Sequence, residues 1–268
     1  LRLIEKHRIT HSQWVPTMFI RMLKLDAADR AGHDLSSHRV AIHAAAPCPV
    51  AVKRQMIEWW GPLIHEYYGG TELNGLTVCN SEQWLAHPGT VGSAILGVLH
   101  ICNGAGDELA VGGTGVSFFE RDEMPFRYHG DREKTDAARH PKHPFWTKLG
   151  DLGYLDEDGF LYLTDRESFM IISGGVNIYS KDIEDVIYRL AAVADVAVIG
   201  IPDDKWGEVV HGIVVCRDDA LLTEDDVISA CRAKLAEFQI PRSIEFRSEL
   251  PRNPSGKLLK RVLRAEFL

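Results

Sequence analysis

The amino-acid sequence predicts an α/β protein: the C-terminal part of a doubly wound large domain with a β-subdomain, then a small mobile α+β domain. Three observations carry the α/β class and the division of the chain into these segments. Strand and helix patterns alternate in residues 1–86, and glycines punctuate short β-rich runs in residues 87–165. Strand and helix patterns alternate again in residues 166–268. At roughly 150 residues per domain, a length of 268 residues corresponds to about two domains.

The first segment, residues 1–36, is expected to be helical. Val15-Pro16 marks a helix start, because proline is tolerated in the first turn of a helix. The apolar residues that follow, from Met18 to Leu25, recur at helical spacing.

A strand–helix–strand unit follows. Residues 40–42 are a short apolar strand, and the small residues 44–47 form a tight loop after it. A helix over residues 49–60 stops at Gly61-Pro62, and residues 62–65 form a second buried strand. This order makes one βαβ unit with two loops that face a ligand.

The β-subdomain is expected to be a small antiparallel barrel or sheet. Its expected strands cover residues 90–92, 107–111 and 115–119. Residues 121–143 are a polar loop with one short helix near residues 132–139. Residues 149–155 and 159–163 then form a hairpin around an Asp-Glu-Asp-Gly turn.

The final segment begins after a polar linker at residues 165–168. Its expected strands cover residues 169–172, 193–201, 208–216 and 244–246. Ser180 is expected to cap a helix that runs to Leu190, and Thr223 with Asp226 to form the capping box of a helix that reaches Ala236. A basic helix ends the sequence.

The stretch Glu66–Glu72 is the first candidate site. It follows a buried strand, and ligands of open α/β sheets sit at the carboxyl ends of strands. Gly69 and Gly70 allow the backbone to turn and to approach a ligand closely. Tyr68 offers a face for a base, Thr71 a hydroxyl for a phosphate, and Glu72 a carboxylate for Mg²⁺. Taken alone, the stretch is also a Gly-Gly turn whose threonine caps the next segment.

Three further stretches accompany it in the sequence. Each of them, taken alone, is also explained by an ordinary structural role such as a turn cap, a surface ion pair or a solvated lysine. The four are Tyr68–Glu72, Leu149–Asp151, Asp165-Arg166 with 171–178, and Pro254–Lys257. Together they resemble the adenylate-forming superfamily of acyl-CoA synthetases, luciferases and peptide-synthetase adenylation domains. Within it, the sequence looks most similar to bacterial fatty-acyl-CoA synthetases, and the resemblance covers the whole chain.

The resemblance implies a two-step reaction. A carboxylate, here expected to be that of a fatty acid, attacks the α-phosphate of ATP to give an acyl-adenylate and pyrophosphate. The thiol of coenzyme A then displaces AMP. Tyr68 and Gly69 match the adenine-binding stretch, and Glu66 lies where a polar side chain meets the adenine amino group. Residues Ala45, Ala46 and Pro47 resemble the small-residue loop that flanks adenine and the acyl carbonyl.

The same resemblance assigns the remaining roles. Thr71 would contact the α-phosphate, and Glu72 would hold Mg²⁺. Asp151 and Arg166 match the residues that bind the ribose hydroxyls.

Two roles fall in the last segment. Lys257 matches the lysine that bridges the attacking carboxylate and the α-phosphate, where a fixed cation stabilises the accumulating negative charge. Gly174 and Gly175 match the loop that lines the pantetheine tunnel.

The sequence departs from the family pattern in four places, one of which is Tyr179-Ser180, where Tyr-Pro is usual. Leu149 stands where a threonine is usual, and Ser168 stands at the hinge, which is usually aspartate or lysine. The family's Ser/Thr/Gly-rich phosphate-binding loop, ending in Pro-Lys-Gly, occurs nowhere in the 268 residues. The expectation is therefore that these residues are the C-terminal portion of a synthetase of about twice the length, inactive by themselves.

Composition excludes several other classes. The formal net charge of −8 argues against nucleic-acid binding, and no apolar run approaches the ~20 residues of a membrane span. Five scattered cysteines indicate neither a disulfide framework nor a zinc site and fit a cytoplasmic protein. Two alternatives stay open: an enzyme that loads a carrier protein, and a non-catalytic nucleotide-binding module. The sequence also leaves a homodimer open.

Overall fold

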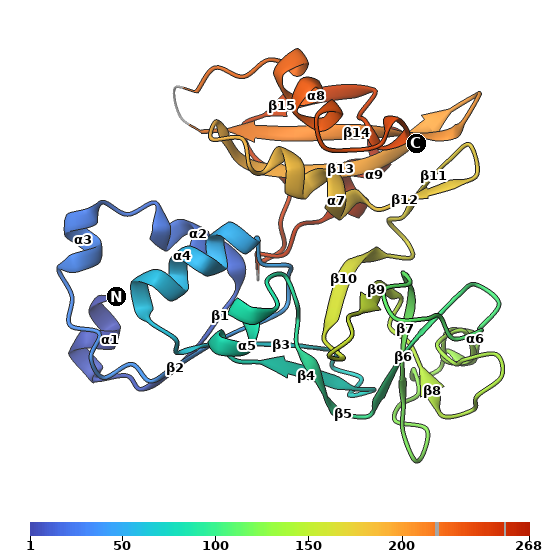
Figure 1. Ribbon diagram of the computed structural model, residues 1–268, viewed down its shortest axis with the longest axis horizontal. Helices are drawn as coiled ribbons and strands as arrows, with labels where there is room; N and C mark the ends of the chain where they lie inside the picture. The colour runs from blue at the N-terminus through green and yellow to red at the C-terminus, as the bar shows by residue number, and fades with distance from the viewer. Residues whose placement is uncertain (218–219, 255) are drawn as a thin grey trace. The chain divides into compact units, whose positions relative to one another are not determined.

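The computed structural model describes residues 1–217, 220–254 and 256–268, which form two compact units (Figure 1). The first unit is Leu1–Leu163 and the second is Thr164–Leu268. Each unit combines β-sheets with helices, so the predicted α/β class is confirmed.

The first sheet of the first unit has the strand order β1-β2-β3-β4-β5. Its strands are β1 (His11–Trp14), β2 (Val40–His43), β3 (Ile64–Gly69), β4 (Leu76–Cys79) and β5 (Ser93–Leu96). The pairs β1–β2 and β2–β3 are parallel, whereas β3–β4 and β4–β5 are antiparallel. Helix α4 (Val50–Trp60) connects the parallel strands β2 and β3, which confirms the predicted βαβ unit.

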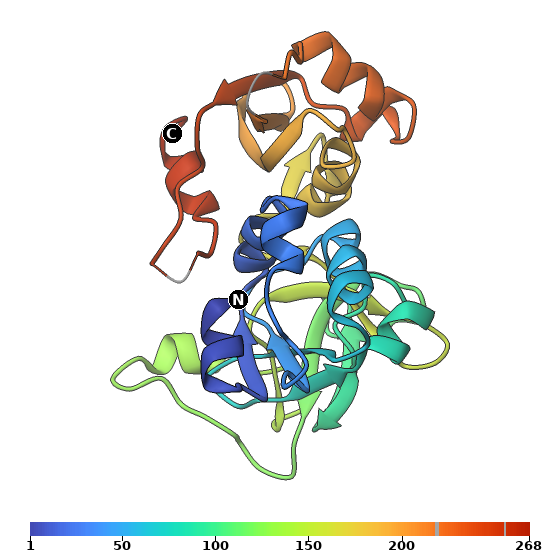
Figure 2. The ribbon, with the colours of Figure 1, turned by 90° about the vertical axis from the view of Figure 1, so that its left-hand side faces the viewer.

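The sequence predicts a helical segment over residues 1–36, but the structure is helical there only in part. It contains α1 (Arg2–His7), α2 (Pro16–Leu23) and α3 (Ala27–Ala31), but His11–Trp14 is strand β1. Pairing with β2 explains the difference, because sheet hydrogen bonds to a distant segment override a local helical pattern. Helix α2 starts at Pro16 as predicted and packs beside α4, as Figure 2 shows. Helix α5 (Ser81–Ala86) follows β4.

The second sheet of the first unit has the order β10-β9-β7-β6, with β8 paired to β7. Its strands are β6 (Val98–Cys102), β7 (Gly115–Glu120), β8 (Trp146–Thr147), β9 (Asp151–Leu155) and β10 (Leu161–Arg166), and the boundary between the units falls within β10, after Leu163. The β9–β10 hairpin and the short helix α6 (Arg132–Ala137) are as predicted.

Two strands predicted for this region are absent from the described residues. Residues 107–111 contribute only an isolated bridge between Glu108 and Cys102. Residues 90–92 form no strand but bond to the first residue of β10. The Val91 amide and the Thr90 hydroxyl both donate to the Leu161 carbonyl. Short runs rich in β-formers therefore serve here as connections that lie against a sheet.

The second unit is built on one sheet of order β12-β11-β14-β13, with β15 parallel to β14. Its strands are β11 (Ile171–Ser173), β12 (Val176–Ile178), β13 (Val193–Asp203), β14 (Gly207–Cys216) and β15 (Ser243–Arg247). Helices α7 (Ser180–Ile187), α8 (Glu224–Arg232) and α9 (Lys260–Ala265) and the 3₁₀ turn Glu237–Gln239 complete it. The buried residues Ile171, Ile183 and Val227 join β11, α7 and α8 in one core.

The helix caps of this unit agree with the sequence in part. Thr223 and Asp226 form the predicted capping box of α8. Ser180 does not cap α7 but is its first residue, and its amide and hydroxyl donate to Oδ2 of Asp165 at 2.8 and 2.6 Å. Both helices stop earlier than predicted, because their last turns tighten into i→i−3 bonds such as Leu190 N–H to Ile187 C=O.

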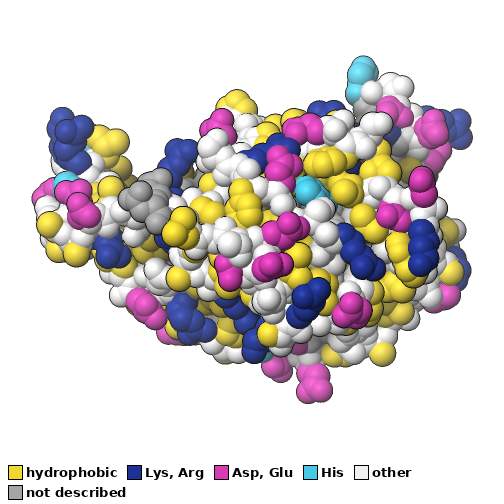
Figure 3. Space-filling model, turned by 90° about the horizontal axis from the view of Figure 1, so that it is seen from above, with side chains coloured by type: hydrophobic (Ala, Val, Ile, Leu, Met, Phe, Trp, Pro, Cys, Tyr) yellow, Lys and Arg dark blue, Asp and Glu magenta, His cyan; other side chains and the backbone are white. Residues whose placement is uncertain are grey.

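The surface carries both signs of charge. On the face in Figure 3, acidic and basic side chains are interspersed with hydrophobic ones. No helix in the described part of the chain has the length and apolar character that a bilayer crossing demands.

Candidate functional site

The loop after β3 is shaped by close packing around two glycines. A Cβ atom at Gly70 would lie 2.3 Å from a side-chain carbon of Leu149 and 2.7 Å from Oε2 of Glu72. A Cβ at Gly69 would lie 2.9 Å from the Gly75 carbonyl. Any side chain at these positions would push neighbouring groups apart. Gly70 therefore lets the first motif of the sequence approach the second, which begins at Leu149.

Tyr68 and Asp151 join these two motifs directly. The Tyr68 hydroxyl donates a hydrogen bond of 2.7 Å to Oδ2 of Asp151, although the residues are 83 positions apart. Asp151 is the first residue of β9 and is only 6% exposed. A phenolic ring and a carboxylate are thus fixed side by side, one suited to stack on a base and the other to accept from hydroxyl groups.

Glu72 has two hydroxyl neighbours. Its Oε2 accepts from Thr71 at 3.3 Å, and its Oε1 accepts from the hydroxyl of Tyr128 at 3.1 Å. Burial is the main cause that raises the pKa of Tyr128, and the hydrogen bond to Glu72 adds to it. The phenol therefore keeps its proton and remains a donor. Sequence reasoning missed Tyr128, because it lies in the irregular 121–143 loop, where no periodic pattern indicates which side chains point inward.

The fit of Mg²⁺ to this part of the chain rests on Glu72. Within the ranges that the structure describes, no three His, Cys, Asp or Glu side chains are grouped so that they could hold a metal ion. Mg²⁺ is often bound by one or two carboxylates while substrate phosphates and water complete its shell. A partly exposed carboxylate such as Glu72 fits that mode of binding.

The loop after β2 opens at the same edge of the sheet. β2 and β3 are parallel, and His43 at the end of β2 pairs with Glu66, so Ala44–Pro47 and Gly70–Glu72 leave the sheet on the same side. Ala45 is exposed and has a φ of 74°, which is rare for a residue with a side chain. Such backbone costs on the order of 1–3 kcal/mol and clusters at binding sites.

A shallow hollow borders Gly150 on the outside of the β9 motif. Its volume is about 180 Å³, and Tyr128, Lys134 and Lys148 line it together with Leu149. The Lys134 ammonium group lies 4.0 Å from the centre of the Tyr128 ring.

Glu66 lies inside the fold. Its side chain is buried against α4, and its Oε2 lies 2.5 Å from Nζ of Lys53. The Oε2 atom of Glu66 is thus held inside the fold by an ammonium group, and a contact of Glu66 with an adenine amino group stays a prediction. Lys53 was missed, although a lysine at helical spacing from the apolar residues Met56, Ile57 and Trp60 was a signal of a buried charge.

The remaining predicted residues belong to the second unit. Gly174 and Gly175 form the turn of the β11–β12 hairpin, with φ of 56° and 82°. A Cβ at Gly174 would lie 2.7 Å from the ring of Trp206, whereas Gly175 has open space around it. Arg166 is the last residue of β10, and its amide donates to Oδ1 of Asp165 at 2.7 Å.

Lys257 lies in a closed turn. Its amide donates to Oδ1 of Asn253 at 2.8 Å, and the Asn253 amide donates to the Lys257 carbonyl at 3.0 Å. Ser255, which the motif also contains, lies outside the described residues. The first unit thus brings Tyr68, Thr71, Glu72 and Asp151 together, and the second carries Arg166, the two glycines and Lys257.

Comparisons with known proteins identify the family. The family model described as AMP-binding enzyme matches residues 1–119, and the model described as AMP-binding enzyme C-terminal domain matches residues 182–257. The chain belongs to the AMP-binding enzymes. This confirms the resemblance to adenylate-forming acyl-CoA synthetases that the four motifs indicated.

Known AMP-binding enzymes resemble this chain over nearly its whole length. It is 39% identical, over 98% of its residues, to a (7a-methyl-1,5-dioxo-octahydro-1H-inden-4-yl)propanoyl:CoA ligase of Rhodococcus jostii (strain RHA1), of which it covers 49%. It is 31% identical, over 99% of its residues, to a long-chain-fatty-acid–CoA ligase of Bacillus subtilis (strain 168), of which it covers 47%. ATP-bound MatB from Rhodopseudomonas palustris has a TM-score of 0.87 and 30% identity, with 99% of this chain and 52% of MatB covered. The chain thus spans about half the length of the relatives it matches.

Proposed function

We propose that this chain supplies part of the machinery that activates a carboxylic acid with ATP and transfers the acyl group to coenzyme A. The contact between Tyr68 and Asp151 carries the proposal, because it places a stacking ring beside a hydroxyl-binding carboxylate at the carboxyl edge of the sheet. In the reaction, an oxygen of the acid attacks the α-phosphorus of ATP and pyrophosphate leaves. The thiol sulfur of coenzyme A then attacks the acyl carbon, and AMP leaves.

The residues of the first unit bind the nucleotide in this proposal. The ring of Tyr68 stacks on adenine, and the carboxylate of Asp151 accepts hydrogen bonds from ribose hydroxyls. Ala45–Pro47 form the wall between adenine and the acyl carbonyl, and the Thr71 hydroxyl donates to the α-phosphate. Glu72 would hold Mg²⁺, which when bound offsets the negative charge of the phosphates.

The residues of the second unit serve the two chemical steps. Lys257 places its ammonium group against the carboxylate and the α-phosphate, where charge builds up during adenylation. Arg166 adds a cation beside the ribose. Gly174 and Gly175 leave room for the pantetheine arm of coenzyme A, and the open space around Gly175 supports that role.

We further propose that the acid is a fatty acid and that the reaction takes place in the cytoplasm. The likeness to the Bacillus subtilis fatty-acid ligase supports the first point, although the Rhodococcus jostii ligase is named for a different acid. The 268 residues alone contain no Ser/Thr/Gly-rich phosphate-binding loop, so we propose that they bind AMP weakly and do not turn over ATP.

The test uses the complete protein encoded with these residues. ATP, Mg²⁺ and a panel of acids of different chain length are supplied with either coenzyme A or a phosphopantetheinyl carrier protein. The proposal predicts AMP, pyrophosphate and acyl-CoA in equal amounts, with a fatty acid as the best substrate. Acyl groups found only on the carrier would favour the loading enzyme instead, and ADP as the product would contradict an adenylate mechanism.

A further inference from the structure

Three buried side chains form a row across the first sheet, near the strand ends that lead into the loops at Ala45 and Thr71. They are His43 at the end of β2, Glu66 in β3 and Cys79 at the end of β4, and they are 0%, 5% and 0% exposed. The strand register pairs His43 with Glu66 and Glu66 with Cys79. Because directly paired residues project to the same face of a sheet, the three side chains lie together.

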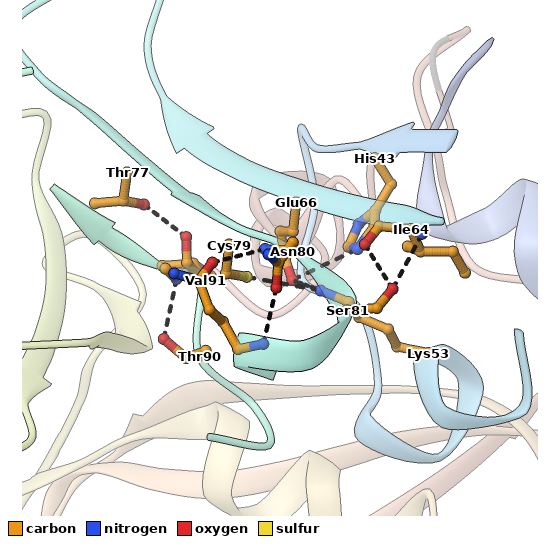
Figure 4. A network of polar contacts seen from close by, with 12 residues as sticks. His43, Lys53, Ile64, Glu66, Thr77, Cys79, Asn80, Ser81, Thr90 and Val91 are labelled. Carbon is orange, nitrogen blue, oxygen red and sulfur yellow. Dashed lines mark hydrogen bonds and ion pairs between the residues drawn. The ribbon is translucent and has the colours of Figure 1, made fainter. Parts of the chain in front are cut away.

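Lys53 of α4 reaches this row, and Figure 4 shows its side chain extending to the Glu66 carboxylate. Its Nζ lies 2.5 Å from Oε2 of Glu66 and 4.0 Å from Sγ of Cys79, and it also faces the ring of Trp84 on α5 at 4.9 Å. Lys53 is fully buried. One side chain therefore joins α4 and α5 to the middle of the sheet.

Lys53 and Glu66 form an ion pair, and the two other side chains of the row, His43 and Cys79, are uncharged. Burial, together with the positive charge of Lys53, lowers the pKa of His43 well below its ordinary value of 6.5. Burial raises the pKa of the Cys79 thiol to about 11. The row thus contains one ammonium group and one carboxylate, which depend on each other because a buried charge without a partner is strongly destabilising.

The pair sits where both ligand loops begin. His43, with Nε2 3.5 Å from Oε2 of Glu66, is the residue before the Ala44–Pro47 loop. Glu66 is two residues before Tyr68 in the same strand. A shift of Glu66 would therefore move β3, which carries Tyr68. It would also move His43, after which the Ala45 loop starts.

We propose that the Lys53–Glu66 ion pair is a positioning device that holds the loops at Ala45 and Thr71 in register for the nucleotide. The inference rests on the proposed function, and neither residue touches the ligand. An apolar pair of similar volume could stabilise the fold equally well. A short, directional ion pair instead admits a single arrangement of α4 against β3, which is what a preorganised site requires.

Amide hydrogen exchange of the 268-residue chain tests the positioning directly. Lys53→Met leaves the Glu66 carboxylate buried without its ammonium partner, and Met56→Ala is the control, since Met56 is a fully buried residue of the same helix. We expect Lys53→Met to speed exchange by about tenfold or more in residues 44–48 and 68–73. Met56→Ala should speed exchange in α4 and leave both loops close to the wild type.

Calorimetric titration with AMP and Mg²⁺ adds a binding readout. Lys53→Met should weaken AMP by on the order of 10- to 10²-fold, as small displacements of binding groups do. The double variant Lys53→Met/Glu66→Gln leaves no lone buried charge, so it should regain stability but keep most of the loss of affinity, because the directional ion pair is still absent. Full recovery of the affinity would overturn the positioning role. Where Lys53→Met does not fold, Glu66→Gln, which keeps an oxygen acceptor for Lys53, gives the same comparison.

The outcomes separate the two proposals. Equal loop exchange in Lys53→Met and Met56→Ala would overturn the positioning role, whatever the affinity for AMP. A wild-type chain that binds no AMP would argue against the proposed function, while the exchange measurement would still decide the role of the ion pair.

Discussion

The hydroxyl of Tyr68 lies 2.7 Å from Oδ2 of Asp151, and this contact joins the end of β3 to the start of β9. Two motifs that are distant in the sequence thus meet at one edge of the first sheet. The proposed nucleotide contacts depend on this meeting, and they lead to five predictions.

Tyr68 should contribute to AMP binding through its ring more than through its hydroxyl. Tyr68→Ala should cost about 1–3 kcal/mol of binding free energy, the contribution of one base–aromatic stack. Tyr68→Phe keeps the ring and loses the bond of the hydroxyl to Asp151, so its loss of affinity should be smaller. Calorimetric titration of AMP into both variants measures the difference, and an unchanged affinity of Tyr68→Ala would place adenine elsewhere.

Glu72 should set the requirement for Mg²⁺. In the complete protein, Tyr128→Phe removes one hydrogen bond to this carboxylate and should raise the Mg²⁺ concentration for half-maximal pyrophosphate release by about tenfold, as loss of an outer partner does. Glu72→Gln should raise it further, because the ligand charge is lost. Arg132→Gln, in the same loop, is the control, because the Arg132 side chain pairs with Asp136 on the surface. Identical Mg²⁺ curves for all these variants would argue against Glu72 as the ligand.

His43 should make the first unit sensitive to acid. Because burial and Lys53 keep its pKa well below 6.5, the folded protein holds His43 neutral. The unfolded chain takes up a proton near pH 6.5, so stability is present above that pH and falls below it, by up to about 1.4 kcal/mol per pH unit. Denaturant unfolding at pH 7.5 and 5.5 should show this loss, and His43→Gln should lose less. Equal losses in both proteins would mean that His43 is protonated in the fold.

Ser168 should serve a rotation of residues 166–268 between the two steps. It follows β10, in a turn in which the Met170 amide donates to the Arg166 carbonyl at 3.0 Å. Proline fixes φ near −65° and restricts the residue before it. In the complete protein, we expect Ser168→Pro to retain adenylation and to lose thioester formation, with Ser168→Ala as the control. Wild-type rates for both steps in the proline variant would mean that the hinge lies elsewhere.

Lys257 should act in adenylation alone. Lys257→Ala in the complete protein should slow acyl-adenylate formation by on the order of 10²–10³, the usual loss for one transition-state donor. Thioester formation from a presynthesised acyl-adenylate should hardly change. Equal damage to both half-reactions, measured by rapid quench, would refute this role.

Motifs and local patterns predicted much of this structure. The βαβ unit, the β9–β10 hairpin and the capping box at Thr223 follow from spacing and turn chemistry, which act over a few residues. Strand β1 was missed because its partner β2 begins at Val40, and only long-range pairing makes His11–Trp14 a strand.

Two partners at the site, Lys53 and Tyr128, were missed for the same reason. A motif indicates that Glu66 is near the ligand loop, but the face of β3 on which it lies depends on the helix that covers the sheet. Lys53 comes from that helix and Tyr128 from an irregular loop, so neither partner belongs to a motif. Local sequence patterns therefore predicted where the loops lie, whereas the contacts of their side chains depend on packing against distant segments.

The most direct test of the account is the acid-dependent formation of an acyl-adenylate by the complete protein. The enzyme is mixed with ATP, Mg²⁺ and a fatty acid without coenzyme A, and the quenched products are identified by mass. The account predicts an enzyme-bound acyl-AMP and an equal amount of pyrophosphate, both reduced when Asp151 is changed to alanine. Pyrophosphate release that does not depend on the acid, or ADP and an acyl phosphate as products, would contradict it.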